Sequence, residues 1–191
     1  MRTKQMRYVC LDFETTGFSK PGTSSHEWPL PFANYPIQLS IDVVEDGEVT
    51  HLYDTLIKGA RQFCPWVKAN VPIVITDLVN GCTLQQVVDD VAALLQDGDT
   101  IVAHNIQYDL ELVLAKACKR RDIGGPALER IMAAPRFCTM RCAYTKSVKA
   151  TSLAKLCAHF EVPLKDAHDA RADSQALAGV VAEAWRRGVM L

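Results

Sequence analysis

The sequence of 191 residues contains no apolar run that approaches the roughly 20 residues needed to cross a bilayer as a helix. Its first residues are basic, but they lack the apolar centre and the small-residue cleavage site of a secretory signal. It also lacks internal repeats and low-complexity linkers. With 49% hydrophobic and 23% charged residues, the composition is that of a folded soluble protein. We therefore expect one domain over residues 1–191, inside the cell and without a membrane partner.

An excess of basic charge is missing as well, since the net charge is −1. This balance argues against a protein that coats nucleic acid through bulk electrostatics. It does not argue against an enzyme that carries its own cluster of carboxylates, because such a cluster lowers the net charge.

The seven cysteines are odd in number, which excludes complete pairing in intramolecular disulfides. One grouping, Cys138, Cys142, Cys157 and His159, contains residue types that bind zinc. Its spacing matches no compact zinc motif, so buried free thiols are the preferred interpretation.

Three strands are predicted in the first third of the chain. Met6–Phe13 is a continuous apolar-rich run typical of a buried strand. Ile37–Val44 and Val49–Ile57 follow, joined by a tight turn in which Gly47 supplies a positive φ. This pattern predicts an antiparallel meander. The segment Ser19–Tyr35 has no periodicity and is predicted to be a long loop.

Helices dominate the rest of the sequence. The stretch Leu84–Leu95 has apolar residues at helical spacing, and Thr83 with Gln86 can form a capping box at its start. Further predicted elements are a strand at Thr100–Ala103 and helices at Tyr108–Cys118, Ser152–Phe160 and Ala170–Trp185. Strands followed by alternating helix and strand indicate an α/β fold with a mixed sheet flanked by helices.

Acidic residues recur where these predicted elements begin or end. Asp12 and Glu14 are two residues apart on a strand, so their carboxylates share one face and repel each other unless a cation joins them. Asp109 falls in the first turn of a predicted helix, which favours an anion. Each acid alone is also compatible with an ordinary solvated or capping role, as are His104 and Asn105 just before that helix.

The third group is His168 and Asp173, which lie five residues apart. In one continuous helix that offset turns the side chains about 140° away from each other. Both can reach one site only if His168 lies on the loop or first turn that enters the helix. The preceding segment Val162–Lys165, which contains a proline, makes such a loop plausible.

Together the three groups resemble the exonuclease motifs of the DEDDh family in the ribonuclease H-like superfamily. Asp12 and Glu14 match Asp-x-Glu-Thr-x-Gly, Asp109 matches the acid of His-Asn-x-x-(Phe/Tyr)-Asp, and His168 with Asp173 matches His-x-Ala-x-x-Asp. The resemblance runs from about residue 6 to residue 185. It implies a five-stranded mixed sheet whose first three strands are antiparallel.

The resemblance also implies a chemistry, hydrolysis of phosphodiester bonds from the 3′ end of nucleic acid with release of nucleoside 5′-monophosphates. Two divalent ions, Mg²⁺ or Mn²⁺, would be held by the four acids, and His168 would act as the general base. Residues implied to contact substrate are Thr15, Thr16, Gly17, Phe18, His104 and Asn105. Phe18 is equally compatible with packing on the core, and Lys146, Lys149 and Lys155 with solvated surface.

The sequence departs from the family pattern at positions that bear on the choice of substrate, and at none of the five catalytic positions. Pro72–Thr76 stands where Ile-His-Gly-Ile-Thr is common, and the glutamate common in the second strand is replaced near Gln38. DNA is slightly favoured as the substrate, with an exoribonuclease as the alternative. A binding module for nucleic-acid ends, or a polymerase-associated scaffold, would be expected to lack one of the five site residues. The sequence leaves open a homodimer or an association with a polymerase.

Overall fold

The computed structural model describes residues 6–17 and 34–189. The sequence predictions for Phe18 and for most of the Ser19–Tyr35 loop lie outside the described residues. In the described part of the chain, no helix combines the length and apolar character that a membrane crossing requires.

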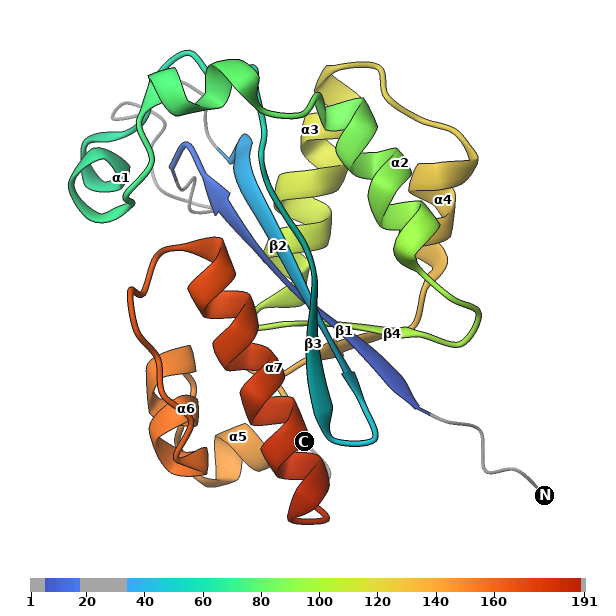
Figure 1. The fold of residues 1–191 in the computed structure, drawn as a ribbon, viewed down its shortest axis with the longest axis vertical. Helices are drawn as coiled ribbons and strands as arrows, with labels where there is room; N and C mark the ends of the chain where they lie inside the picture. The colour runs from blue at the N-terminus through green and yellow to red at the C-terminus, as the bar shows by residue number, and fades with distance from the viewer. Residues whose placement is uncertain (1–5, 18–33, 190–191) are drawn as a thin grey trace.

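A single five-stranded sheet forms the centre of the fold (Figure 1). Its spatial order is β3-β2-β1-β4-β5, with β1 antiparallel to β2, β2 antiparallel to β3, and the pairs β1–β4 and β4–β5 parallel. The strands are β1 (Arg7–Thr15), β2 (Pro36–Glu45), β3 (Glu48–Leu56), β4 (Thr100–Ala103) and β5 (Arg136–Cys138). The predicted ribonuclease H-like mixed sheet with an antiparallel start is confirmed.

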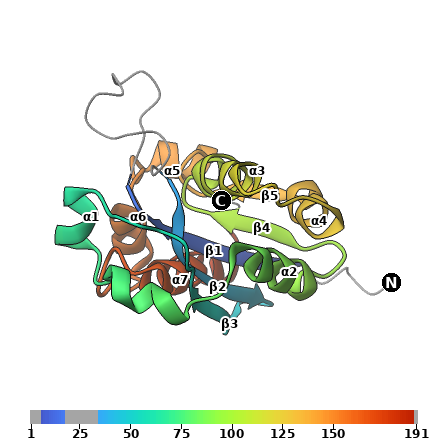
Figure 2. The same cartoon turned by 90° about the horizontal axis from the view of Figure 1, so that it is seen from above.

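Helices surround this sheet. They are α1 (Pro65–Asn70), the 3₁₀ helix η1 (Ile75–Asn80), α2 (Leu84–Leu94), the π-helix η2 (Tyr108–Ala115), α3 (Lys116–Arg120), α4 (Pro126–Ala133), α5 (Ala143–Ser147), α6 (Leu153–Phe160) and α7 (Ala170–Arg186). Figure 1 shows α2, α3 and α4 gathered in one group and α5, α6 and α7 in another, and Figure 2 shows the sheet from above.

Because successive side chains of a strand point to opposite faces of the sheet, the residues of β1 lie in two different environments. Val9, Leu11 and Phe13 point into the large apolar core, which also contains the buried faces of α2, η2 and α4. Cys10, on the opposite face of β1, packs with residues of α7 in a separate cluster. Asp12 and Glu14 continue this second face toward the end of the strand. The alternation therefore turns both carboxylates toward α7.

Buried polar contacts hold α7 against the sheet. The Ser174 hydroxyl on α7 donates a hydrogen bond of 2.6 Å to Asp42 of β2 and lies 2.9 Å from the Ser40 hydroxyl. All three residues are almost fully buried. His51 on β3 contacts the other carboxylate oxygen of Asp42 at 3.2 Å. Because Ser174 follows Asp173 directly, this network also fixes where Asp173 meets the sheet.

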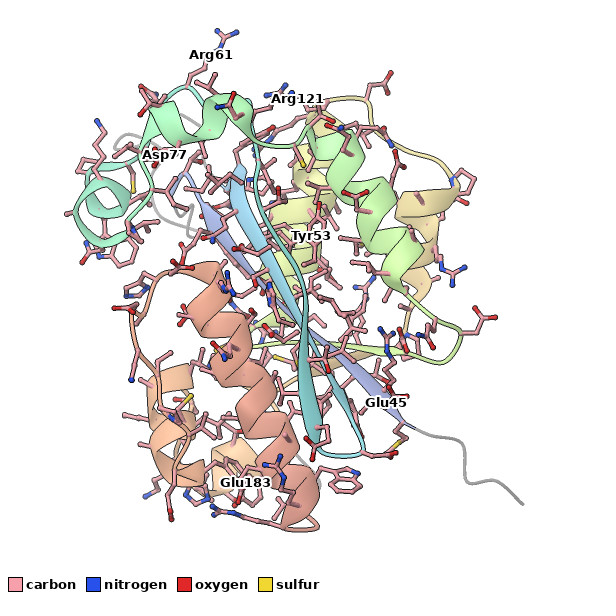
Figure 3. The ribbon with its side chains drawn as sticks, in the orientation of Figure 1. Glu45, Tyr53, Arg61, Asp77, Arg121 and Glu183 are labelled. Carbon is pink, nitrogen blue, oxygen red and sulfur yellow. The ribbon has the colours of Figure 1, made fainter. Side chains whose placement is uncertain are left out.

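The opposite group of helices is tied to the sheet in a similar way. Tyr53 on β3 donates its hydroxyl to Asp90 of α2 at 2.8 Å, and Figure 3 shows its side chain between these two elements. The capping box at the start of α2 is confirmed, with Thr83 accepting from the Gln86 amide and the Gln86 side chain accepting from the Thr83 amide.

The structure departs from the sequence-based prediction in several short elements. The expected helix Tyr108–Cys118 is a π-helix that continues as α3, which an apolar period of 3.6 residues does not reveal. Elements that the periodicity missed are α1, η1, α4, α5 and β5. Each is short, with eight residues or fewer, which gives a hydrophobic period little room to appear.

The turn between β2 and β3 gives a test of packing against α7. A Cβ added at Gly47 would lie 2.6 Å from the Trp185 ring, and the φ of Gly47 is +79°. We expect Gly47→Ala to lower the free energy of unfolding by about 2–4 kcal/mol, the sum of backbone strain and overpacking. Urea denaturation measures it. Gly188→Ala is the matched control, because its φ is +65° and nothing lies within 4 Å of an added Cβ. An equal loss in both variants would exclude the Trp185 contact as a cause.

Candidate functional site

The carboxyl end of β1 and the start of α7 bring the predicted acidic residues together. Glu14, His168 and Asp173 each offer one ligand atom, and these atoms all lie within 4.8 Å of one another. Within residues 6–17 and 34–189 this is the group of three or more metal-ligating side chains that converges in this way. The predicted convergence of the first and third motifs is thus present in the fold.

His168 lies outside the helix, as the five-residue offset required. Helix α7 begins at Ala170, and the Asp169 side chain caps it by accepting from the Arg171 amide. The backbone N–H of His168 donates to Oδ2 of Asp173 at 3.2 Å. His168 has a φ of +72°, an uncommon conformation for a residue with a side chain. The loop geometry therefore returns His168 toward Asp173 in spite of their separation along the chain.

Asp109 reaches the same region from the start of η2. Its carboxylate accepts hydrogen bonds from its own backbone N–H and from that of Phe13, which lies between Asp12 and Glu14. Burial raises the pKa of Asp109 to about 7, and these two hydrogen bonds oppose the rise. The contact with the Phe13 backbone places the second motif beside the first.

Neighbouring negative charge adds to the effect of burial on three of the acids, Asp12, Glu14 and Asp173. Asp12 and Glu14 are half-buried, and their carboxylates lie close enough to the other acids for their charges to interact. Burial, followed by the charges of Asp109 and Glu14, raises the pKa of Asp12 well above its ordinary range. Burial and the charge of Asp173 raise the pKa of Glu14 to about 8. Burial also raises the pKa of Asp173, against its hydrogen bond from His168.

One atom of this cluster indicates what would relieve the repulsion. Oδ1 of Asp173 is buried and has no hydrogen-bond partner, alone in this respect among the buried side-chain atoms of the described residues. A buried, unpaired carboxylate oxygen among other carboxylates fits a divalent cation, whose preferred ligands are such oxygens. Asp12, Glu14, Asp109 and Asp173 therefore form a suitable set of ligands for the metal that the sequence predicted.

The residues predicted to contact substrate are placed less uniformly. Thr15 and Thr16 are buried, with the Thr15 hydroxyl 3.0 Å from that of Tyr108 and the Thr16 hydroxyl accepting from the Tyr35 amide. The carbonyl of Gly17 accepts from the Asn34 amide. The Thr15 and Thr16 side chains make contacts within the protein. Any contact between this segment and a substrate is therefore left to backbone atoms.

His104 and Asn105 belong to the turn between β4 and η2. Nε2 of His104 lies 3.1 Å from the carbonyl of Thr151, and Nδ1 lies 2.9 Å from the Thr139 hydroxyl. Burial lowers the pKa of His104, which favours a neutral ring held between two loops. Asn105 has a φ of +95°, and its carbonyl accepts from the Tyr108 amide. This geometry favours the satisfied turn role that the sequence had left open.

Trp66 is a residue of this region that sequence reasoning missed. It lies on α1, and its ring meets that of His168 edge to face with centroids 5.0 Å apart. It remains 42% exposed. The amide of Cys64 donates to the carbonyl of Thr16, which ties α1 to the end of β1. The only signal in the sequence was Pro65 at the first position of a helix too short to show a period.

The alternative zinc grouping does not assemble. Cys157 is buried on α6, Cys142 caps α5 by accepting from the Thr145 amide, and His159 lies 2.7 Å from the Tyr144 hydroxyl. In the described part of the chain, Cys138, Cys142, Cys157 and His159 are not among the side chains whose ligand atoms converge. All seven cysteines are free, but the prediction of buried thiols holds only for Cys10, Cys118 and Cys157; the other four are partly exposed.

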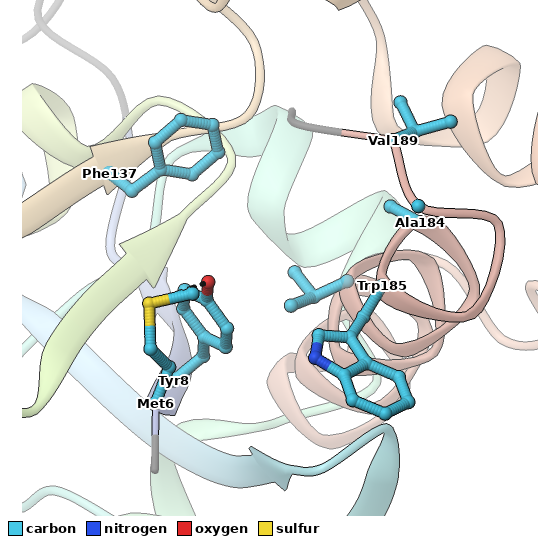
Figure 4. Close-up of a pocket in the computed structure, with 8 residues that line it drawn as sticks. Met6, Tyr8, Phe137, Ala184, Trp185 and Val189 are labelled. Carbon is cyan, nitrogen blue, oxygen red and sulfur yellow. Dashed lines mark hydrogen bonds between the residues drawn. The ribbon is translucent and has the colours of Figure 1, made fainter. Parts of the chain in front are cut away.

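A second hollow of about 360 Å³ lies at the other end of β1 (Figure 4). It is lined by Met6, Tyr8, Phe137, Val181, Ala184, Trp185, Gly188 and Val189. Tyr8 and Glu14 are six residues apart on one strand, which separates them by about 20 Å. Among the residues that the structure describes, the lining contains no carboxylate or imidazole, so this part of the hollow lacks the chemistry of the acidic cluster.

The raised carboxyl pKa values predict a pH-dependent cost of folding without metal. A folded-state pKa of Glu14 near 8, above the ordinary 4.5, stabilises the protein below pH 4.5, and this contribution is lost as the pH rises toward 8. In EDTA, Glu14→Gln should therefore unfold at a higher temperature than wild type near pH 8, and the difference should shrink toward about pH 5. Each kcal/mol corresponds to roughly 2–4 °C.

Thermal unfolding monitored by circular dichroism measures this difference. Glu129→Gln, at an exposed position on α4, is the matched control and should follow wild type at every pH. Adding Mg²⁺ near pH 8 should stabilise wild type more than Glu14→Gln. A Glu14→Gln protein less stable than wild type in EDTA near pH 8 would contradict the electrostatic account.

Comparison with known proteins places this geometry in context. Residues 9–181 match the exonuclease family (RNase_T). The chain is 28% identical over 151 residues to the 3′-5′ exonuclease DinG of Staphylococcus epidermidis. That match covers 79% of this chain and 16% of the relative, so the chain spans less than a fifth of the length of that relative.

Solved structures share the fold at low sequence identity. A 3′-exonuclease that recognises the 3′ end of a histone mRNA stem-loop superimposes with a TM-score of 0.77 at 14% identity, covering 97% of this chain and 84% of the other. Escherichia coli Exonuclease I with a dT13 oligonucleotide gives 0.70 at 16% identity, covering 94% of this chain and 41% of the other. With the family match spanning most of its length, this chain belongs to the exonuclease family.

Proposed function

We propose that the chain is a single-domain 3′–5′ exonuclease that hydrolyses phosphodiester bonds at the 3′ end of nucleic acid. The observation that carries the proposal is the convergence of Glu14, His168 and Asp173 within 4.8 Å, at the place where Asp12 and Asp109 also meet. Family membership supports the reaction class. A binding module without catalysis would have no need to keep this costly cluster of acids intact.

The four carboxylates are proposed to hold two Mg²⁺ or Mn²⁺ ions. A set of carboxylate oxygens selects such hard cations over zinc. When bound, the ions supply positive charge that stabilises the attacking and leaving oxygens of the phosphoryl transfer. The unpaired Oδ1 of Asp173 and the raised pKa values of Asp12 and Glu14 support this assignment.

His168 is proposed as the general base. Its side chain is exposed on the loop before α7 and reaches the acidic cluster, and imidazole accepts protons near neutral pH. His168 would take a proton from water as the water oxygen bonds to phosphorus. The bond from phosphorus to the 3′ oxygen then breaks, and that oxygen receives a proton. The products are a nucleoside 5′-monophosphate and a strand shortened by one nucleotide.

Trp66 is proposed to support the terminal nucleobase. Its ring is partly exposed and touches the ring of His168, so a base stacked on it would bring the adjoining phosphate close to the acids. Stacking on an aromatic ring contributes about 1–3 kcal/mol per base and tolerates any sequence. The predicted stacking role of Phe18 lies outside the described residues.

DNA is the proposed substrate, with RNA as the second candidate. The RNA alternative is favoured by one specific observation, the similarity to a 3′-exonuclease that recognises a histone mRNA stem-loop, while Exonuclease I with dT13 supports DNA. Location inside the cell, a homodimer and association with a polymerase remain predictions from the sequence.

Matched DNA and RNA oligonucleotides labelled at the 5′ end test the reaction. With Mg²⁺ or Mn²⁺ we expect a ladder that shortens from the 3′ end, absent in EDTA and in Asp12→Ala. His168→Ala should slow the reaction by roughly 10²–10⁴-fold, the usual effect of removing a general base. The relative rates rank DNA against RNA. Near-normal activity of Asp12→Ala would refute the site assignment, and an inactive wild type would favour the binding module.

Substitution of Trp66 tests the proposed stacking platform. Trp66→Ala should raise KM for a single-stranded oligonucleotide by roughly 5- to 100-fold, the equivalent of the lost stacking energy, whereas Trp66→Phe should retain most of the affinity. Trp185→Ala removes a similarly exposed tryptophan, 48% exposed, at the far end of α7. Below its unfolding temperature this control should keep a normal KM, and an unchanged KM in Trp66→Ala would exclude stacking.

A further inference from the structure

The side chain of Gln38 links β2 to the beginning of α7. Gln38 is buried, with 6% of its surface exposed, and it lies directly across from Glu14 in the pairing of β1 with β2. Its Oε1 accepts a hydrogen bond of 3.1 Å from the backbone N–H of Ala170, the first residue of α7. This bond satisfies an amide that has no partner inside the helix.

The amide nitrogen of Gln38 makes the complementary contacts. Nε2 donates to Oδ1 of Asp169, the residue that caps α7, at 3.3 Å and to Oδ1 of Asp54 on β3 at 3.1 Å. Asp54 in turn lies 4.0 Å from the Arg171 guanidinium. The Gln38 side chain therefore binds the backbone amide of Ala170, the Asp169 carboxylate that caps α7, and Asp54 on β3. These contacts lie where the loop that carries His168 enters α7.

Only an amide of this length can make these contacts together. The site requires an acceptor facing Ala170 and a donor facing two carboxylates. An ionised glutamate keeps the acceptor but has no donor, and it adds a third negative charge beside Asp54 and Asp169. This constraint gives a physical reason for glutamine at the position where the sequence departs from the family pattern.

Resting on the exonuclease function proposed above, we propose that Gln38 is a positioning residue of the site. By fixing Asp169 and the amide of Ala170, it determines where α7 begins, and with it the orientation of His168 and Asp173 on either side of that point. Gln38 itself contacts neither the reacting atoms nor, in this proposal, the substrate. Its loss should therefore slow the catalytic step and leave substrate affinity nearly unchanged.

The experiment compares Gln38→Glu with the double variant Gln38→Glu/Asp54→Asn. In the double variant an asparagine amide at position 54 can donate to the new carboxylate, which restores one hydrogen bond and returns the local net charge to that of wild type. At mildly alkaline pH, Gln38→Glu should lower kcat by roughly 10- to 100-fold, the scale expected from a displacement of about 1 Å, with KM changed less than about threefold. The double variant should recover most of kcat.

Gln85→Glu provides the matched control. Gln85 donates its amide to Asp89 within the exposed surface of α2, so the substitution makes the same chemical change away from the site. Its kcat should equal that of wild type. Hydrogen exchange in the metal-free proteins gives a second readout, because the amides of residues 168–173 should exchange faster in Gln38→Glu than in wild type or in Gln85→Glu.

The outcomes separate the two proposals. A normal kcat in Gln38→Glu, a loss of activity that only follows a loss of folded protein, or unchanged exchange over residues 168–173 would overturn the positioning role while the exonuclease function stood. Failure of the double variant to recover kcat would also overturn it. A wild-type protein that degrades neither DNA nor RNA would overturn the proposed function, and the positioning role with it.

Discussion

Mutual repulsion among neighbouring carboxylates is the constraint on which the rest of the site depends. Asp12, Glu14, Asp109 and Asp173 come from three separate elements; burial raises the pKa of each, and neighbouring negative charge adds to the rise for Asp12, Glu14 and Asp173. A fold that gathers them loses solvation and gains repulsion. The surrounding packing must therefore hold the acids in place at a cost in stability, until a cation offsets their charge.

The scaffold meets this requirement by fixing α7 at its start and along its length. Ser174 is bound to Asp42 in the interior, and Gln38 receives the first amide of the helix. Both anchoring residues of the sheet, Asp42 and Gln38, lie on β2, next to the strand that carries Asp12 and Glu14. Strands β1 and β2 thus carry Asp12 and Glu14 together with the contacts that position Asp173. Disturbance of β2 should consequently reach the site through α7.

His168 and Asp173 lie on either side of the start of α7 and differ in their surroundings. His168 lies outside the helix, exposed and at a positive φ, where it is restrained by Asp173 and by the edge of the Trp66 ring. Asp173, five residues later, lies half-buried in the first turn of α7, next to the anchored Ser174. This division suits the general-base role proposed for His168, in which the imidazole exchanges a proton with water beside acids whose positions stay fixed. Trp66 adds an apolar surface next to this polar site.

The sequence by itself determined the strands of the meander and the long helices, because these follow local periodicity. It pointed to the five proposed site residues through their resemblance to the family motifs, since each acid alone also fits an ordinary capping or solvated role. It also required His168 to precede α7, since a helix turns five residues through a fixed angle. Only the tertiary structure decided the π-helical form of η2, the closure of His104 between two loops, and the arrival of Trp66 and Gln38 at the site. These depend on contacts between residues such as Gln38 and Ala170, 132 positions apart, for which no local pattern exists.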